Sequence, residues 1–415
     1  GSSAEAHAAT TGMSLFAAPA NIDRAPVRSW CLAAIAAALA DVLIFVILDR
    51  AGLSLEPAQA LAFAAALLAA LGVLQNFACE HRWTTLCFVV ALAYPLRAGV
   101  LSLLAAQGSP LVAIVPAALA GALTLLLGGR VIAAGTRRQD FAIAVPLAVI
   151  YLLVLRLVYL GQIELAPQEA YYWNYAQHLD IGYLDHPPLV AWLIAATLAL
   201  GDGEFFVRLP AVFSWAVMLA FAIAYAQDMA GRGNALRTAL LATTLPFCFG
   251  IGVMVTPDAP LAAAWAAALF FLQRALLGES RVAWLGAGLA IGIGMLAKYS
   301  MVLVPAAAFV FMLVDARSRR SLLSVWAWGG VLIALLVFSP VIVWNLQHDW
   351  ASFAFQGSRR LAARAPQFSL PEFLAAALLL LTPLGVLALW RLWRPRGDMS
   401  ATFQATPAND ERNLL

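Results

Sequence analysis

The sequence predicts an all-α polytopic membrane protein. Of its 415 residues, 63% are hydrophobic and only 11% are charged, whereas charged residues make up about a quarter of a typical soluble domain. The mean hydropathy is +0.85, and apolar runs of about 20 residues, the length that a helix needs to cross a bilayer, recur along the chain. This composition excludes a soluble enzyme and a nucleic-acid-binding protein, and the net charge of +3 indicates no particular partner.

The apolar runs divide the chain into two membrane domains. Residues 1–22 are rich in Ala, Ser, Thr and Gly, and we set them aside as a disordered, tag-like segment. A four-span domain is expected over 23–138 and an eight-span domain over 139–394, followed by a polar cytoplasmic tail over 395–415. The expected spans are 29–48, 57–78, 84–105, 109–128, 141–160, 209–226, 236–255, 259–277, 282–297, 299–315, 322–343 and 371–390.

Arginine positions orient these spans. Short cytoplasmic loops carry an excess of Lys and Arg, so Arg24 and Arg28 place the N-terminus in the cytoplasm, and later arginine clusters mark the other internal loops. The loop 161–187, which contains acidic residues but neither Lys nor Arg, then lies outside. The apolar run Pro188–Leu200 is too short to cross, and a crossing there would invert every later loop. We therefore expect it to form a juxtamembrane helix on the outer surface.

The first domain carries two charges within its expected spans, Asp41 and Arg97. Charges at that depth usually face a partner or a wet cavity, so the two residues mark either a polar path or a buried ion pair that fixes packing. Over about residues 25–135 the chain resembles the GtrA family of four-span proteins, in ALADVLIFVIL and in QNFACEHRWTT. That family is associated with moving polyprenyl-phosphate sugars across membranes, so the resemblance implies that this domain helps to deliver a lipid-linked sugar.

The second domain contains a polar, aromatic outer loop, APQEAYYWNYAQHLDIGYLDHPP. Aromatic faces stack on sugar rings, and carboxylates accept hydrogen bonds from sugar hydroxyls or act as a general base. The alternative is an ordinary interfacial belt of Tyr and Trp. Three further segments map to the same membrane face: the TPDAP segment with Asp258, the Lys298-Tyr299 pair, and the loop 344–360. Taken singly, Asp258 suits a helix N-cap, Lys298 a snorkelling side chain, and Arg359 and Arg360 contacts to lipid phosphates.

These motifs, EAYYW, GYLDHPP, TPDAP, GIGMLAKYS and WNLQHDWASFAFQ in that order, resemble the bacterial branch of the GT-C glycosyltransferases. That branch is related to the dolichyl-phosphate-mannose protein mannosyltransferases and to the lipid A aminoarabinose transferase, and the resemblance covers about residues 141–394. It implies a GT-C-type helical core, a sugar donor carried on a polyprenyl phosphate, a catalytic first outer loop and inversion at the sugar carbon. Many relatives have Asp-Glu where this chain has Gln168-Glu169, and relatives continue with further helices beyond 371–390.

The candidate residues follow from the chemistry of transfer from a lipid phosphate. A cation must neutralise the leaving phosphate, and Lys298 is the first choice, ahead of Arg359 and Arg360, with Arg208 weaker. Glu169 is the favoured general base and Asp185 the second choice. The remaining predicted substrate-binding residues are Tyr171, Tyr172, Trp173, Tyr183, His186, Asp258, Tyr299, Asn345 and His348. We expect no metal ion and no cofactor, because no Asp-x-Asp pair occurs and Cys31, Cys79, Cys87 and Cys248 lack metal-ligand spacing.

The predicted function is a glycosyltransferase in the bacterial inner membrane, with its active site facing the periplasm. It would move a sugar from a polyprenyl-phosphate donor to an envelope lipid, glycan or protein, and a sugar-lipid synthase is a candidate partner. One alternative is a flippase or transporter, which predicts charges lining the spans. The other is a non-catalytic protein that binds a lipid-linked sugar, which Gln168 in place of an acid keeps open.

Overall fold

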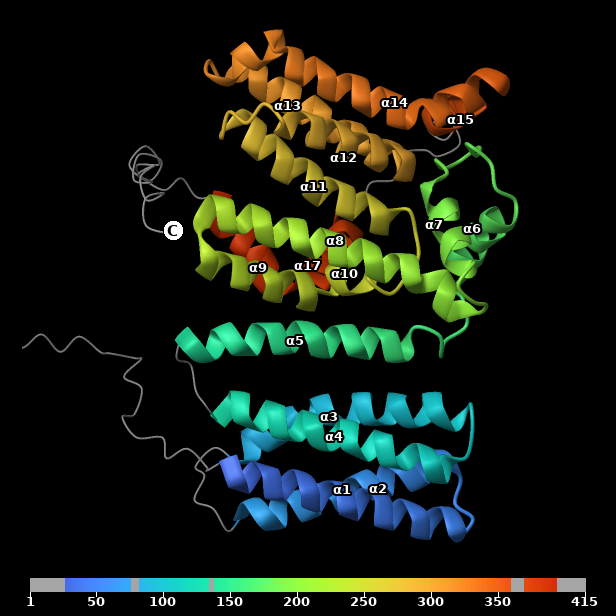
Figure 1. The fold of residues 1–415 in the computed structure, drawn as a ribbon, viewed down its shortest axis with the longest axis vertical. Coiled ribbons are helices and arrows are strands. Elements are labelled where there is room, and N and C mark those ends of the chain that lie inside the picture. Colours follow the sequence, from blue (N-terminus) through green and yellow to red (C-terminus); the bar gives the residue numbers. More distant parts are fainter. Residues whose placement is uncertain (1–26, 76–81, 134–137, 360–368, 394–415) are drawn as a thin grey trace, which may run out of the picture. The chain divides into compact units, whose positions relative to one another are not determined.

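The computed structural model describes residues 27–75, 82–133, 138–359 and 369–393, and every regular element in this part of the chain is helical (Figure 1). The chain divides into two compact units, Gly1–Ala144 and Val145–Leu415. The all-α class expected from composition is therefore confirmed. The predicted domain boundary at residues 138 and 139 falls close to this division.

Within its described residues, the smaller unit contains four complete helices and the first residues of a fifth. Helix α1 packs against α2 and α4, and α3 packs against α4. Alanines such as Ala33, Ala37, Ala66 and Ala70 fill much of the core around Trp30, which lets the helix backbones approach closely. The helices are α1 (Val27–Arg50), α2 (Leu55–Gln75), α3 (Arg82–Ala105) and α4 (Pro110–Ala133), and they overlap the four spans expected here.

Asp41 and Arg97 form an ion pair inside this unit. The Arg97 Nε and Nη2 atoms donate to the two Asp41 carboxylate oxygens at 3.0 and 2.7 Å, and both side chains are buried. Gln59 from a third helix accepts from Arg97 Nη1 at 3.5 Å. Of the two interpretations of these charges, the structure provides the buried pair, because each charge faces its partner across the bundle.

The larger unit is built on long helices that run side by side (Figure 1). Helix α8 packs on α11, α11 on α12, and α12 on α14. The α12 and α14 backbones meet at Gly288 and Gly330, where a Cβ on Gly288 would lie 2.1 Å from the Gly330 carbonyl oxygen. The long helices are α5 (Arg138–Tyr159), which crosses the unit boundary, α8 (Glu204–Ala230), α9 (Arg232–Thr244), α11 (Asp258–Leu276), α12 (Ala283–Ala297), α13 (Leu303–Val314), α14 (Val325–Gln347) and α17 (Leu370–Trp393).

Seven helices of the described residues, α1, α2, α4, α5, α8, α11 and α14, are long and apolar enough to cross a membrane. The span expected at 236–255 is wrong as a single helix, because it breaks into α9 and the short α10 (Pro246–Gly250). Pro246 lacks an N–H group and cannot pair with the Ala242 carbonyl one turn earlier. The Trp215 indole N–H donates to that carbonyl instead, at 3.1 Å. Helix α17 also kinks, at Thr382 before Pro383.

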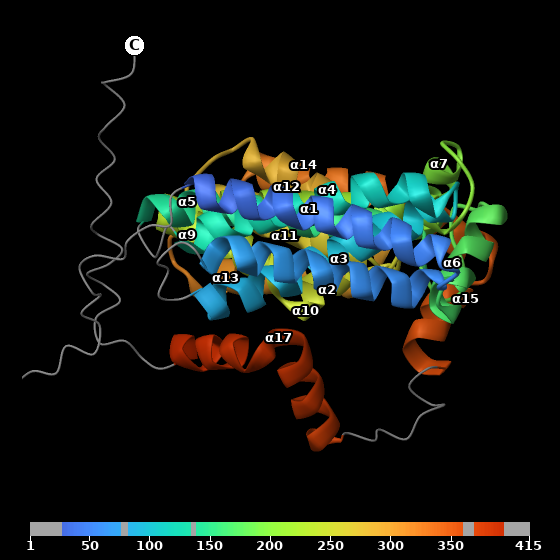
Figure 2. The same ribbon diagram turned by 90° about the horizontal axis from the view of Figure 1, so that it is seen from below.

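The two ends of the larger unit differ in chemistry. The short helices α6 (Pro167–Gln177), α7 (Leu189–Leu198) and α15 (Ala351–Ala354) gather at one end, as both views show (Figures 1 and 2). Arginine pairs Arg274–Asp228 and Arg317–Glu279 hold helix ends and loops on the other side of the long helices. Helix α7 has 10 residues, too few to cross a bilayer.

Candidate functional site

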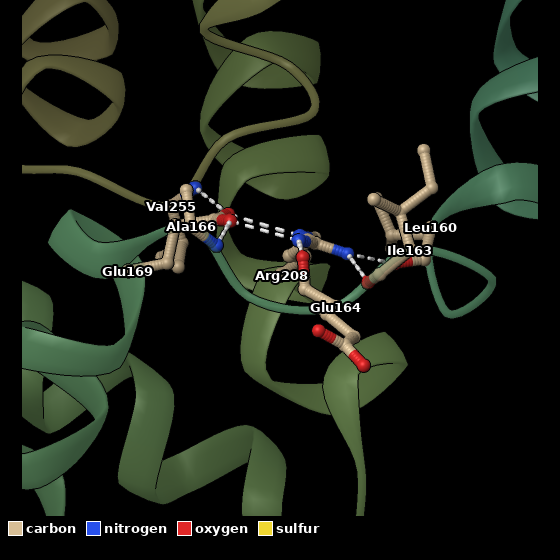
Figure 3. Close-up of polar contacts among 7 residues, drawn as sticks. All are labelled: Leu160, Ile163, Glu164, Ala166, Glu169, Arg208 and Val255. Carbon is tan, nitrogen blue, oxygen red and sulfur yellow. Dashed lines mark hydrogen bonds and ion pairs between the residues drawn. The ribbon is translucent and has the colours of Figure 1, made fainter.

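Glu169 fixes the start of the first-loop helix α6 in a buried ion pair (Figure 3). Its Oε1 atom accepts from Arg208 Nε at 2.9 Å and from the Val255 amide at 3.1 Å. Its Oε2 atom accepts from Arg208 Nη2 at 2.8 Å and from the Ala166 amide at 3.0 Å. Burial acts to raise the pKa of Glu169, but the hydrogen bonds from Arg208, Ala166 and Val255 outweigh it and lower the pKa.

Arg208 has an acceptor for each of its five N–H groups. Besides the two bonds to Glu169, it donates to the carbonyls of Leu160, Ile163 and Glu164 at 2.9, 2.6 and 2.8 Å. The Glu164 carboxylate points away from this network (Figure 3). The pair thus ties the end of α5, the loop after it, α6, α8 and the segment before α11 to one another.

These contacts change two predicted roles. Glu169 was the favoured base, but its side chain is 1% exposed and its oxygens already accept four hydrogen bonds. Arg208 was a weaker candidate for the lipid phosphate, but its donors are all engaged within the protein. Both groups are buried and fully hydrogen-bonded within the protein, so we revise both roles and infer that the pair positions the first loop.

Asp185, the second choice for the base, has a partly exposed carboxylate that meets α6. Tyr175 Oη donates to Asp185 Oδ1 at 2.6 Å, and Tyr171 Oη donates to Oδ2 at 2.9 Å. His186 Nε2 lies 4.0 Å from Oδ2. Gln356 of the π-helical turn η3 (Phe355–Arg359) donates to the Asp185 backbone carbonyl. The first outer loop and the segment after α14 therefore meet at the Asp185 backbone.

Tyr172 is buried on α6, and the charges of both Asp185 and Asp258 affect its phenol. Burial, together with the charges of Asp185 and Asp258, raises the pKa of its phenol to about 12, against a hydrogen bond with Gln168. The His186 ring packs edge-on against Tyr172, with 5.6 Å between centroids. Gln168 thus forms a hydrogen bond with a buried tyrosine, and the charges of Asp185 and Asp258 both raise the pKa of the same phenol.

Lys298 pairs with Asp258 where the C-terminus of α12 meets the N-terminus of α11. Helix α12 stops at Ala297 and α11 starts at Asp258, and Lys298 Nζ donates to Asp258 Oδ1 at 2.7 Å. Both side chains are partly exposed. Pro257 occupies the N-cap position of α11 and Asp258 is the first residue of the helix, so Asp258 is not the N-cap; its carboxylate pairs with Lys298. Lys298 is the single lysine among the 25 Lys and Arg residues of the chain.

The loop after α14 packs against the first outer loop through aromatic side chains. Trp344 Nε1 donates to Asp180 Oδ2 at 3.0 Å, and the Trp344 ring stacks on His348 with 4.0 Å between centroids. A Cβ on Gly182 would lie 2.5 Å from Trp344, so only glycine allows this close packing. His348 Nδ1 contacts the Trp344 carbonyl at 2.8 Å, which leaves its Nε2 edge to face outward from that contact.

Three further predicted ligands take structural positions. Asn345 is buried, donates to the Val341 carbonyl at 2.9 Å and accepts from the Phe353 amide at 3.3 Å, so its predicted role as a substrate ligand is revised. Tyr299 Oη contacts Ser352 Oγ at 2.7 Å. Tyr183 Oη accepts from the Asp180 amide and donates to backbone carbonyls of α6 and its end. Each of these side chains supports a loop of the site.

The structure describes only some of the remaining predicted residues. Trp173 is exposed on α6. Arg360 lies outside the described residues, as does the side chain of Arg359. Tyr175 and Gln356 were not predicted, although the spacing of four between Tyr171 and Tyr175 places both on one face of a helix. Within the described residues, no group of three His, Cys, Asp or Glu side chains is arranged to hold a metal ion.

An apolar cavity of about 650 Å³ lies among the same helices. Helices α7, α8, α11 and α12 form its walls, and Leu189 and Pro260 lie close in sequence to His186 and Asp258. Its polar lining is confined to Thr197 and Ser214, and the Thr197 hydroxyl donates to a backbone carbonyl of its own helix. The cavity therefore suits a hydrocarbon chain.

Residues 185–344 match the family described as dolichyl-phosphate-mannose-protein mannosyltransferase. The matched segment starts at Asp185, includes Asp258 and Lys298, and ends at Trp344. This part of the chain is therefore similar to the GT-C glycosyltransferases, as the motifs indicated. No solved structure matches the chain.

Several curated glycosyltransferases are similar to the chain. The lipid A galacturonosyltransferase RgtD of Rhizobium johnstonii is 31% identical over 44% of this chain and 38% of its own length. The undecaprenyl phosphate-alpha-4-amino-4-deoxy-L-arabinose arabinosyl transferase 1 of Sodalis glossinidius is 29% identical over 59% and 44%. The lipopolysaccharide core galacturonosyltransferase RgtA of R. johnstonii is 29% identical over 46% and 39%. The chain thus spans less than half the length of each. The resemblance of residues 25–135 to the GtrA family stays a prediction.

Proposed function

We propose that the chain transfers a sugar from a polyprenyl-phosphate donor to an acceptor of the bacterial envelope, at the periplasmic face of the inner membrane. One observation carries the proposal: the Asp185 carboxylate on the first loop and the Lys298–Asp258 pair at the ends of α12 and α11 lie at the same end of the larger unit (Figure 1), where the charges of both acids affect Tyr172. The family match over this same segment supports it. A carboxylate and a cation at one site are the two groups that transfer from a lipid phosphate requires.

In the proposed reaction, an acceptor hydroxyl oxygen attacks the anomeric carbon of the donor sugar. A new C–O bond forms on the face opposite the phosphate, the old C–O bond breaks, and the lipid phosphate leaves with the bonding electrons. Lys298 neutralises the charge that develops on the leaving phosphate, and the hydroxyl proton moves to Asp185. The product has the inverted configuration. No metal ion is part of the proposal, because one lipid phosphate needs less charge neutralisation than a nucleotide diphosphate.

The surrounding structure supports this division of roles. The ion pair of Glu169 and Arg208 holds α6 in place, and α6 carries the two tyrosines that contact Asp185. The apolar cavity would hold the donor's lipid chain, since two of its walls, α11 and α12, also carry Asp258 and Lys298 at their ends.

The acceptor is proposed to be a component of lipopolysaccharide. Two of the relatives are named for lipid A or for the lipopolysaccharide core. The mass of lipid A and core oligosaccharide from a strain lacking the protein would test this. A deficit of one sugar is expected, and an unchanged mass of both fractions would reject the acceptor class.

Translocation is the second candidate, and it concerns the smaller unit. The resemblance of residues 25–135 to the GtrA family supports this candidate, whereas the buried Asp41–Arg97 pair fixes the packing of the helices and does not favour transport. On this proposal the smaller unit delivers the donor to the outer leaflet, and proximity raises the local donor concentration for transfer.

Transfer of radiolabelled sugar from a polyprenyl-phosphate donor to lipid A, by the protein in nanodiscs, tests the base directly. Asp185→Asn should lower kcat by about 100- to 10,000-fold, the usual contribution of a general base. The matched control is Asp202→Asn, which removes an exposed carboxylate from the loop between α7 and α8. A full rate for Asp185→Asn would reject the assignment of the base.

A further inference from the structure

The Asp185 carboxylate and two tyrosine hydroxyls form a triangle of three groups, with one oxygen–oxygen contact along each side. Tyr175 Oη lies 2.6 Å from Asp185 Oδ1, and Tyr171 Oη lies 2.9 Å from Asp185 Oδ2. The two phenol oxygens are themselves 2.5 Å apart. Both tyrosines come from α6 at a spacing of four residues, so one helix face presents both hydroxyls to the carboxylate.

The triangle is held in place from several sides. The Tyr175 ring stacks on Tyr183 with 4.1 Å between centroids and 10° between planes. Tyr183 Oη in turn donates to the Tyr175 carbonyl at 3.1 Å. The first turn of α6 is fixed by Glu169 and Arg208, and Gln356 donates to the Asp185 backbone carbonyl. Little rotation of the carboxylate or of the phenols is possible without breaking these contacts.

We propose that Tyr175, together with Tyr171, positions the Asp185 carboxylate for transfer and donates hydrogen bonds to it in the ionised state. This rests on the proposed function, in which Asp185 takes the acceptor's proton. Both tyrosines are positioning residues, since they act through Asp185. Burial and the hydrogen bonds to Asp185 and Tyr171 raise the pKa of Tyr175, so its phenol keeps its proton.

A count of protons explains why two phenols suit a general base. Three oxygen–oxygen contacts close the triangle, but ionised Asp185 and two phenols supply only two protons for them. When Asp185 takes up the acceptor's proton, a third becomes available, and one phenol O–H can then turn toward the other phenol oxygen, so that each contact has a proton. The carboxyl group therefore keeps hydrogen-bond partners before and after proton transfer, and the change needs only rotation of O–H bonds.

Replacement of each tyrosine by phenylalanine tests the contribution of its hydroxyl group alone. Tyr175→Phe keeps the ring that stacks on Tyr183 and removes only the oxygen, and Tyr171→Phe does the same at the other corner. A lost hydrogen bond to a charged group predicts a fall in kcat of about ten- to a hundredfold for Tyr175→Phe, with the donor KM unchanged. Tyr225→Phe on α8 is the matched control and should keep the wild-type kcat, because Tyr225 lies near the arginine-rich end with Asp228.

A double-mutant cycle shows whether Tyr175 acts through Asp185. In an Asp185→Asn background, Tyr175→Phe should cause no further loss of the residual rate. If Tyr175→Phe and Tyr171→Phe both keep the wild-type kcat while Asp185→Asn is inactive, the positioning role is overturned and the proposed function stands. Equal losses from Tyr175→Phe in both backgrounds would also overturn it. Full activity of Asp185→Asn would overturn the base and, with it, the role of both tyrosines.

Discussion

Glu169→Gln provides the sharpest test of the revised role of Glu169. Each Glu169 oxygen accepts two hydrogen bonds, one from Arg208 and one from a backbone amide. A glutamine has one oxygen, so in either orientation its NH₂ group faces two donors, and Arg208 keeps a buried charge without a counter-ion. Removing one partner of a buried pair costs about 3–5 kcal/mol of the free energy of unfolding. We expect a fall in Tm on the order of 10 °C.

The assay is thermal unfolding of the detergent-solubilised protein at pH 7, beside single-turnover transfer by the folded fraction. Glu164→Gln is the control, because Glu164 contacts Arg208 only through its backbone carbonyl, and it should keep the wild-type Tm. The lowered pKa of Glu169 adds a pH signature. Its stabilising contribution is present above the unfolded-state value near 4.5 and is lost as pH falls through the lower folded-state pKa, so the Tm difference between wild type and Glu169→Gln narrows on acidification. A variant with wild-type Tm but no transfer would show that Glu169 is the base after all.

Three further outcomes are expected. An amine-reactive acyl reagent should modify one side chain, Lys298, and abolish transfer. Bound donor should protect Lys298 from the reagent. Modification without loss of activity would exclude Lys298 from phosphate binding. A cysteine at position 258 should react with an impermeant maleimide added from the periplasmic side of oriented vesicles, and labelling from the cytosolic side alone would invert the topology. In the smaller unit, Asp41→Asn should lower the free energy of unfolding by about 3–5 kcal/mol, whereas a double replacement of Asp41 and Arg97 by Leu and Met should cost less, as measured by chemical denaturation.

Much of the site was accessible from the sequence because sidedness is a local property. Apolar runs and arginine clusters placed the TPDAP segment, Lys298 and both outer loops on one face, and the structure brings these segments into contact through the Lys298–Asp258 pair and the Trp344–Asp180 bond. Amino-acid composition could not show which acid of the loop is buried in an ion pair and which is a candidate general base. Glu169 and Asp185 are both carboxylates in a polar aromatic motif, and nothing in their sequence neighbours distinguishes a buried carboxylate from a partly exposed one.

The sequence by itself determined that the chain is helical, where most helices lie, and which segments share an end of the larger unit, since hydropathy and charge act over a single helix length. Only the tertiary structure decided the partners. Arg208 reaches Glu169 across 39 positions and Lys298 reaches Asp258 across 40, and such pairings depend on how helices rotate and pack against one another. Packing therefore separated the acid that anchors the start of α6 from the acid whose carboxylate stays partly exposed.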